Sequence, residues 1–220
     1  VACGPDTGFD NKMLFQAQNR IFSIHPVPNS NYLGGAHESW QILNSEERSG
    51  FAIQHINKIS IENCSFIASK EFDIKENEKP IHIYSKALET GRLLIQEFFS
   101  EIFKQGIVNY DQLNKNSFSE YLSWPRLFTP LNGWIDWNWD CEEIYKFCLA
   151  FHEPYEGAKS FFKDKEIKLL PIEKNISKIH PYASGIITSI LEKNNLITVA
   201  AKGGLITVSY THLRAHETTD

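Results

Sequence analysis

The sequence predicts an α/β fold in two parts, a layer of strands and helices followed by a small β-barrel. Three observations lead to this prediction. Short apolar, strand-like runs alternate with helical patterns up to Gly106, which is typical of an α/β layer. A polar stretch without periodicity, Asn109–Ser123, comes next. Beyond it, one capped helix precedes several short strand-like segments separated by Gly and Asn, the pattern of a small barrel.

The first half is expected to hold three strands and two helices. The strands are short apolar runs, at Arg20–Ile24, Gly50–Ile56 and Ser65–Phe72. Between the first two, Ala36–Asn44 has the composition of a short helix. Pro80 begins a longer helix that ends before Gly106, because Pro suits a first helical turn and Gly the position after the last. Apolar side chains recur on it at spacings close to three and four: Ile83, Ala87, Leu94, Phe98 and Ile102.

The second half is expected to begin with a helix. Asp140 and Glu143 have the spacing of a capping box, in which the Asp140 carboxylate accepts a hydrogen bond from the backbone N–H of Glu143. An apolar stripe follows at helical spacing, formed by Ile144, Phe147, Cys148 and Phe151. The strands of the predicted barrel come after it, at Lys159–Phe162, Ile167–Leu170, Gly185–Leu191, Leu196–Ala201 and Leu205–Val208.

The composition is that of a globular protein, with 42% hydrophobic and 22% charged residues. The chain has neither an apolar run long enough to span a membrane nor a signal-peptide pattern, so a cytoplasmic location without membrane contact is predicted. Upstream sequence is expected to be missing, because the chain begins at Val1 without an initiator methionine. The 4 cysteines have no CxxC spacing and no clustered histidines, so we predict free thiols and no metal site.

The most informative segment is residues 23–35, which read SIHPVPNSNYLGG. In it His25 leaves an apolar strand and enters a loop rich in Pro and Asn that closes on Gly34 and Gly35. Such a segment presents an imidazole at a strand end. It resembles the signature of the folate-dependent formyltransferases, Asn-x-His-Pro followed by a Pro-containing loop and Tyr-x-Gly. Ser23 stands here in the place of the asparagine.

Residues of the second half extend the resemblance. Pro125-Arg126, then Asn132–Trp137 and then Pro154–Ala158 follow the order of the formyltransferase C-terminal domain motif. The chain is therefore similar to the two-domain group that contains methionyl-tRNA formyltransferase and sugar N-formyltransferases. Within this motif we interpret Asp136 and the cluster of Trp134, Trp137 and Trp139 as structural, because grouped aromatic side chains are more often packed than used for recognition.

The resemblance also implies a division into domains. Residues 1–108 correspond to the C-terminal part of a Rossmann-like catalytic domain. Residues 121–208 correspond to an OB-like β-barrel domain. Residues 209–220 look foreign to the family and are interpreted as a tail, either non-native sequence or a disordered end.

The resemblance implies transfer of a formyl group from 10-formyltetrahydrofolate to an amine. This reaction passes through a tetrahedral oxyanion, so it needs a proton shuttle and a hydrogen-bond donor for the developing charge. The family uses an asparagine, a histidine and an aspartate for these tasks. His25 matches the histidine and Ser23 occupies the asparagine position. Glu62 is the carboxylate nearest the expected aspartate position, if one residue is inserted.

The acceptor is expected to be a small-molecule amine, such as an amino-sugar nucleotide, rather than methionyl-tRNA. The net charge of the chain is −5, and a surface that binds nucleic acid needs an excess of basic residues. Residues 121–208 hold ten basic and ten acidic residues, a net charge of zero. Because two of the three catalytic positions are substituted, a second reading stays open. In that reading the chain is a non-catalytic relative that binds a ligand or partner.

Overall fold

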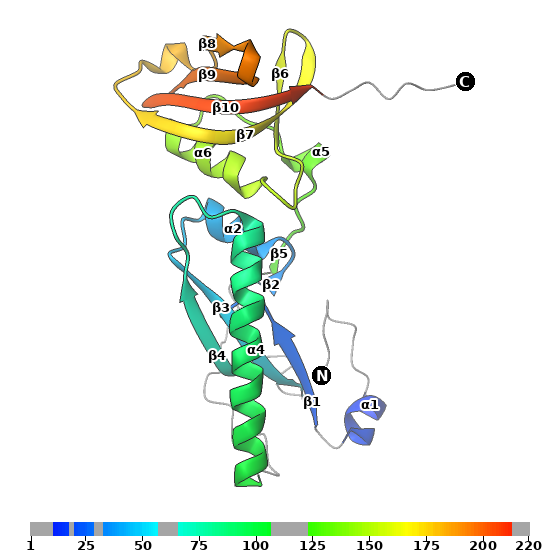
Figure 1. The fold of residues 1–220 in the computed structure, drawn as a ribbon. Helices are drawn as coiled ribbons and strands as arrows, with labels where there is room; N and C mark the ends of the chain where they lie inside the picture. The colour runs from blue at the N-terminus through cyan, green and yellow to red at the C-terminus, as the bar shows by residue number, and fades with distance from the viewer. Residues whose placement is uncertain (1–10, 18–19, 29–32, 57–65, 107–122, 213–220) are drawn as a thin grey trace, which may run out of the picture. The chain divides into compact units, whose positions relative to one another are not determined.

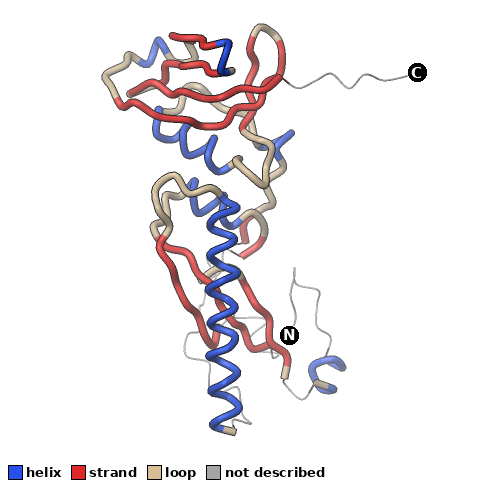
Figure 2. The backbone as a smooth tube through the Cα atoms, in the orientation of Figure 1, coloured by secondary structure: helices blue, strands red, loops and turns tan. Residues whose placement is uncertain are grey.

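The structure is a computed structural model that describes residues 11–17, 20–28, 33–56, 66–106 and 123–212. The chain divides into two compact units. The first comprises Val1–Gln41, Glu46–Glu76 and His82–Arg126, and the second comprises Ile42–Ser45, Asn77–Ile81 and Leu127–Asp220. The fold is of the α/β type, as the sequence predicts (Figures 1 and 2).

The first unit holds a three-stranded sheet and a long helix. Its elements are α1 (Asn11–Gln16), β1 (Ile21–His25), β2 (Leu33–Gly34), α2 (His37–Leu43), β3 (Arg48–Ile56), β4 (Phe66–Asp73), α4 (Pro80–Gln105) and β5 (Ser123–Trp124). The five elements predicted for this half are therefore confirmed, each within about two residues at its ends. The predicted polar stretch 109–123 lies outside the described residues except for its last position.

The sheet has the order β1-β3-β4, and both pairs of strands are antiparallel. Parallel pairing joins β2 to β5 among the described strands. The finer expectation of a Rossmann-like domain is therefore not confirmed. Apolar strand runs predict burial on both faces, but they do not distinguish parallel from antiparallel neighbours once helices cover the sheet.

Helix α4 covers one face of this sheet (Figures 1 and 2). Phe22, Phe51 and Ile53 of the strands form a buried cluster with Leu94, and Phe98 packs against it. The helix lies close to the sheet at Gly91, where an added Cβ atom would lie 2.5 Å from the Phe51 ring. The predicted apolar stripe of α4 thus contributes Leu94 and Phe98 to this first core. The opposite face of the sheet carries the candidate site.

The second unit holds a five-stranded sheet with one helix against it. Its elements are α5 (Thr129–Asn132), α6 (Cys141–Ala150), β6 (Ala158–Phe162), β7 (Lys165–Ile176), η3 (Pro181–Ala183), β8 (Ile187–Leu191), η4 (Glu192–Asn194), β9 (Leu196–Ala201) and β10 (Gly204–His212). The order is β6-β7-β10-β9-β8, and neighbouring strands are antiparallel. The helix and the five strands were all predicted from the sequence.

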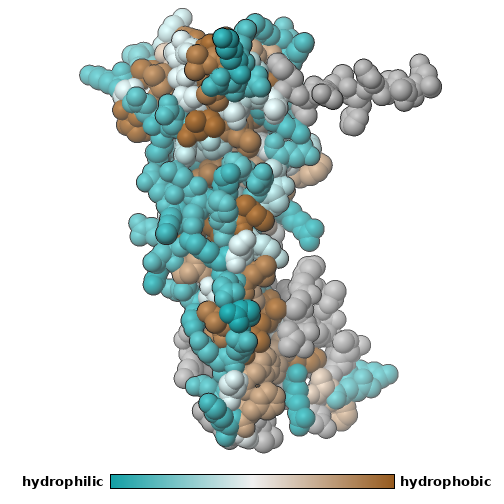
Figure 3. All heavy atoms as spheres, in the orientation of Figure 1, coloured by the Kyte–Doolittle hydropathy of each residue, from teal (hydrophilic) through white to brown (hydrophobic). Residues whose placement is uncertain are grey.

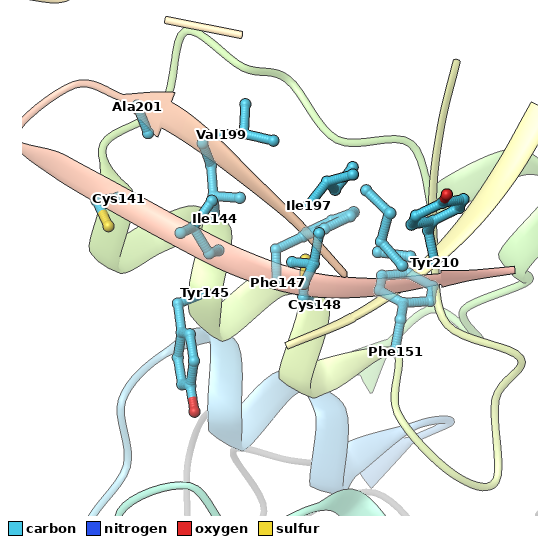
Figure 4. Close-up of a cluster of buried hydrophobic side chains, with 14 of the residues drawn as sticks. Cys141, Ile144, Tyr145, Phe147, Cys148, Phe151, Ile197, Val199, Ala201 and Tyr210 are labelled. Carbon is cyan, nitrogen blue, oxygen red and sulfur yellow. The ribbon is translucent and has the colours of Figure 1, made fainter. Parts of the chain in front are cut away.

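The predicted closed barrel is not found in the part of the chain that the structure describes. Strands β6 and β8 lie at opposite ends of the strand order, so the sheet is open. The physical reason lies in α6, whose side chains fill the apolar face of the sheet (Figure 4). A sheet covered by a helix buries its apolar face without closing on itself.

Two strands run further than predicted. β7 continues past Leu170 to Ile176, with Pro171 placed where the β10 register shifts, between Thr207 and Val208. A proline lacks the N–H that a regular ladder needs, and a bulge is one of the few positions in a sheet that accepts it. β10 continues four residues beyond Val208 to His212, so it includes the first residues of the segment interpreted as a tail.

The core of the second unit lies between α6 and the sheet. Figure 4 shows Ile144, Phe147, Cys148 and Phe151 on the side of α6 that faces Ile197 and Val199 of β9. Cys148 is fully buried, and this burial raises the pKa of its thiol to about 12. Cys141 and Cys148 are free thiols, as predicted. Cys3 and Cys64 lie outside the described residues.

Large apolar side chains also remain exposed on the second unit, among hydrophilic ones (Figure 3). They are Phe128, Leu131, Trp139, Phe161, Ile172, Ile176, Tyr182, Ile186, Ile190 and Leu191. Scattered exposed apolar side chains are normal on protein surfaces and need no partner to explain them. Of the helices that the structure describes, none combines the length and the apolar content that a membrane span needs.

The capping of α6 gives a first testable prediction. The Asp140 side chain accepts a 3.0 Å hydrogen bond from the backbone N–H of Glu143, as the capping box predicts. Asp140→Ala removes this acceptor, so we expect the free energy of unfolding to fall by about 1 kcal/mol. Asp140→Asn keeps an acceptor oxygen and should retain most of the stability. Urea denaturation of both variants checks this, and an equal loss in the two would contradict the role of the cap.

Candidate active site

His25 is the last residue of β1, and the residues after it fix where its side chain lies. Val27 is 1% exposed and packs with Ala52 and Phe66, while the rings of Trp40 and Trp124 lie against the same cluster. Apolar anchoring two residues beyond the histidine holds the start of the loop to the sheet. The imidazole is itself partly buried. The structure therefore places His25 at a strand end, as the sequence predicts.

The glycine pair after the loop is required by a close approach of two backbones. Gly34 has φ +106°, and its strand β2 pairs with β5, so an added Cβ atom would collide with the backbone of Trp124. The N–H of Gly35 donates to the Trp124 carbonyl at 3.1 Å. Trp40 Nε1 donates to the Pro125 carbonyl at 2.9 Å. These bonds join two segments that the sequence analysis singled out separately, Gly34-Gly35 and Pro125-Arg126.

Four side chains share the sheet face that α4 leaves uncovered. In the β1–β3 register Ser23 pairs with Gln54 and His25 pairs with Ala52. Paired residues of an antiparallel sheet project to the same side, as do residues two apart on one strand. Ser23 and Gln54 are only 4% and 5% exposed. The face thus carries a buried hydroxyl and a buried amide beside the imidazole.

The imidazole contacts groups of both neighbouring strands. His25 Nε2 lies 3.0 Å from Gln54 Oε1 on β3, and the His25 ring centroid is 5.3 Å from that of Phe66 on β4. An amide oxygen can only accept a hydrogen bond, so this contact is a hydrogen bond in the tautomer that carries its proton on Nε2. The strand end therefore holds an oriented imidazole, the kind of group that acts as a general acid or base.

The predicted site residues have different outcomes. His25 and Ser23 lie on one face of β1, within a buried polar group that also includes Gln54. Glu62, the third predicted residue, lies outside the described residues. Sequence reasoning missed Gln54, although Gln54 and His55 are two consecutive polar residues in the otherwise apolar run Phe51–Ile56, and such an interruption is a usable signal.

His55 does not belong to this group. It pairs with Phe22, on the side of the sheet that α4 covers, and it is fully buried there. Its ring centroid is 5.4 Å from that of Phe22. Adjacent residues of a strand point to opposite faces, which is why Gln54 and His55 lie in different surroundings.

The aromatic motif of the second unit has structural contacts. Trp137 Nε1 donates to Ser160 Oγ at 3.0 Å, and the Trp134 ring stacks on Phe161 with centroids 4.9 Å apart. Asp136 Oδ1 accepts a 2.9 Å hydrogen bond from the backbone N–H of Asn138, which closes a turn. Trp139 contacts the ring of Phe147 in the core. These contacts agree with the structural interpretation of the motif.

Comparison with known proteins identifies relatives for both units. Residues 128–219 match the family described as "Formyl transferase, C-terminal domain". Methionyl-tRNA formyltransferase of Flavobacterium psychrophilum is 26% identical over 191 residues, which cover 85% of this chain and 57% of that protein. The bifunctional polymyxin resistance protein ArnA of Wigglesworthia glossinidia brevipalpis is 26% identical over 146 residues, covering 66% of this chain and 21% of that protein.

Solved structures have the same fold. An N-formyltransferase of Helicobacter canadensis, in complex with folinic acid and dTDP-3-aminofucose, aligns with a TM-score of 0.62 and 17% identity, covering 89% of this chain and 67% of that one. HypX of Aquifex aeolicus, in complex with tetrahydrofolic acid, aligns with a TM-score of 0.61 and 18% identity, covering 88% of this chain and 32% of that one. The chain thus spans only part of the length of the relatives it matches.

Proposed function

We propose that this chain belongs to the formyltransferase family and takes part in transfer of a formyl group from 10-formyltetrahydrofolate to an amine. The observation that carries the proposal is His25 at the end of β1, with its ring hydrogen-bonded to Gln54 on the neighbouring strand. The family match of residues 128–219 and the two relatives, which cover 66% and 85% of this chain, support it. The catalytic residues proposed are His25, Ser23 and Glu62.

In this proposal His25 moves the proton of the acceptor amine. An amine must lose a proton as it forms its bond to the formyl carbon, and a positioned imidazole is well suited to take it at neutral pH. Ser23 is two residues away on the same face, and its hydroxyl is the proposed donor to the developing oxyanion. A hydroxyl is shorter than the amide of an asparagine, so a bridging water would extend its reach. Glu62 is proposed as the carboxylate partner of the histidine, whose negative charge stabilises the imidazolium that forms.

We propose an amino-sugar nucleotide or a similar small amine as the acceptor. Residues 121–208 hold ten basic and ten acidic residues, so they provide no excess of positive charge for binding the phosphates of a tRNA. The N-formyltransferase of Helicobacter canadensis was solved in complex with dTDP-3-aminofucose, an amino-sugar nucleotide. A second candidate acceptor is methionyl-tRNA, because the relative in Flavobacterium psychrophilum is a methionyl-tRNA formyltransferase.

The division of the chain is also proposed. Residues 1–108 are assigned to the catalytic domain and residues 121–208 to the C-terminal domain, with a cytoplasmic location. Ser23 in the asparagine position keeps the non-catalytic relative as an alternative, because loss of an oxyanion donor alone costs roughly 10²–10³ in rate.

The test is a direct assay of the complete gene product with 10-formyltetrahydrofolate. A panel of amino-sugar nucleotides, including dTDP-3-aminofucose, is compared with methionyl-tRNA, and the formylated product is identified by mass spectrometry. Formylation of an amino sugar supports the proposal, and formylation of methionyl-tRNA alone replaces the acceptor class. Binding of the folate without turnover of any acceptor favours the non-catalytic alternative.

A further inference from the structure

We propose that Gln54 is a positioning residue for His25. In this proposal its side-chain oxygen holds the Nε2–H of the imidazole, so that Nδ1 is the nitrogen that exchanges the proton with the acceptor amine. The inference rests on the proposed function, because it assigns a task to Gln54 within the same site. It concerns a residue on β3 that the sequence motif does not include.

The geometry explains why Gln54 can orient the ring. Gln54 lies in the middle of β3, between β1 and β4, and it pairs with Ser23 on one side and Phe66 on the other. Its side chain crosses diagonally to His25, which is two residues further along β1, and closes a 3.0 Å hydrogen bond. Diagonal neighbours in a sheet are within reach of long side chains. The Phe66 ring, 5.3 Å from the imidazole, borders the same site.

The burial of Gln54 increases the contribution of this hydrogen bond. Gln54 is 5% exposed, so water competes little for its amide oxygen, and a buried amide pays a penalty when its partner is removed. Both partners stand on paired strands, which hold a catalytic geometry more closely than loops do. An amide also brings no charge to the site, so the ring can stay neutral and able to accept a proton.

In the proposed formyl transfer, the bonds formed and broken and the proton transferred are balanced. A bond forms between the acceptor nitrogen and the formyl carbon, and the bond between that carbon and the folate nitrogen breaks. The acceptor nitrogen loses one proton and the departing tetrahydrofolate nitrogen gains one. His25 carries this proton on Nδ1, while its Nε2–H remains bonded to Gln54 throughout. No oxidant, reductant or further reactant is needed.

Two matched variants test the proposal by kinetics. Gln54→Met keeps the length of the side chain and removes the acceptor, so we expect kcat to fall roughly tenfold to a hundredfold with little change in KM. Gln41→Met makes the same change at a glutamine of α2 that is 1% exposed and outside the β1–β3 pair. It should leave kcat unchanged. Thermal unfolding of both variants shows whether the fold is intact.

A double-mutant cycle separates positioning from a merely structural role. If Gln54 acts through the imidazole, Gln54→Met should cost almost nothing in a His25→Gln background, because the group it orients is gone. An equal loss of kcat in both backgrounds would overturn the proposal. So would a Gln54→Met enzyme with wild-type kcat.

A spectroscopic readout works without turnover. In ¹⁵N-labelled chain the Nε2–H proton of His25 should exchange slowly and give an NMR signal, which Gln54→Met abolishes and Gln41→Met preserves. Absence of that signal from the wild type, or its survival in Gln54→Met, overturns the positioning role whatever the activity. If the wild type formylates no acceptor but shows the signal and its loss, the hydrogen bond stands, and the proposed function and the proton transfer assigned to Nδ1 are both overturned.

Discussion

His25→Gln is expected to lower kcat for formyl transfer by about 10²–10⁴, the usual contribution of a positioned general acid or base. A glutamine side chain fills much of the same volume and can still hydrogen-bond, but it cannot carry a proton between two nitrogens at neutral pH. Binding of the folate donor should change little, because the substitution removes a step of the reaction rather than a contact with the folate. The measurement is steady-state kinetics of the complete gene product, with donor binding followed separately.

The matched control is His82→Gln, a change at an exposed histidine of α4. It alters the same chemical group away from β1 and should leave kcat and the unfolding temperature as they are. Turnover of His25→Gln equal to that of the wild type would remove His25 from the mechanism. A similar loss in both variants would point to a general effect on the fold instead.

The sequence could predict the elements because local signals agree with burial. The stripe of Ile83, Ala87 and Leu94 and the cap at Asp140 each depend on residues near in sequence, and the structure confirms both. Closure of the barrel depends on whether β6 meets β8, which are about 30 residues apart. Strand patterns fix which face is buried but not whether two edges meet, so the open sheet could not be read from them.

In the candidate site, too, local sequence signals could be predicted and contacts between distant residues could not. His25 could be found because its motif is contiguous along the chain, from the strand end to Gly34-Gly35. Gln54 could not be assigned, because its role depends on the register of β1 against β3, a relation between residues 29 apart in sequence. The interruption of an apolar strand by Gln54 marked a buried polar group but not its partner. Glu62 lies outside the described residues and stays a prediction.

The largest expected effect on stability is at Phe151, the C-cap residue directly after α6. Phe151 is 1% exposed, and its ring lies 4.8 Å from that of Phe147 and 5.7 Å from that of Tyr155. Phe151→Ala removes a large side chain from the middle of the α6–sheet core and leaves a cavity that the sheet cannot collapse to fill. We expect the free energy of unfolding to fall by about 3–5 kcal/mol.

The control for this prediction is Phe161→Ala in the same unit. Phe161 is 65% exposed, although its ring stacks on Trp134 at 4.9 Å, so its removal forfeits one aromatic contact and opens no cavity. Such a contact contributes about 0.5–1.5 kcal/mol, well below the loss expected at Phe151. Urea denaturation followed by circular dichroism measures both, and the midpoints are comparable only if the slopes agree. An equal loss of unfolding free energy in Phe161→Ala and Phe151→Ala would contradict this prediction. Burial would then not determine which phenylalanine contributes more to stability, and the α6 stripe would not be the main core of this unit.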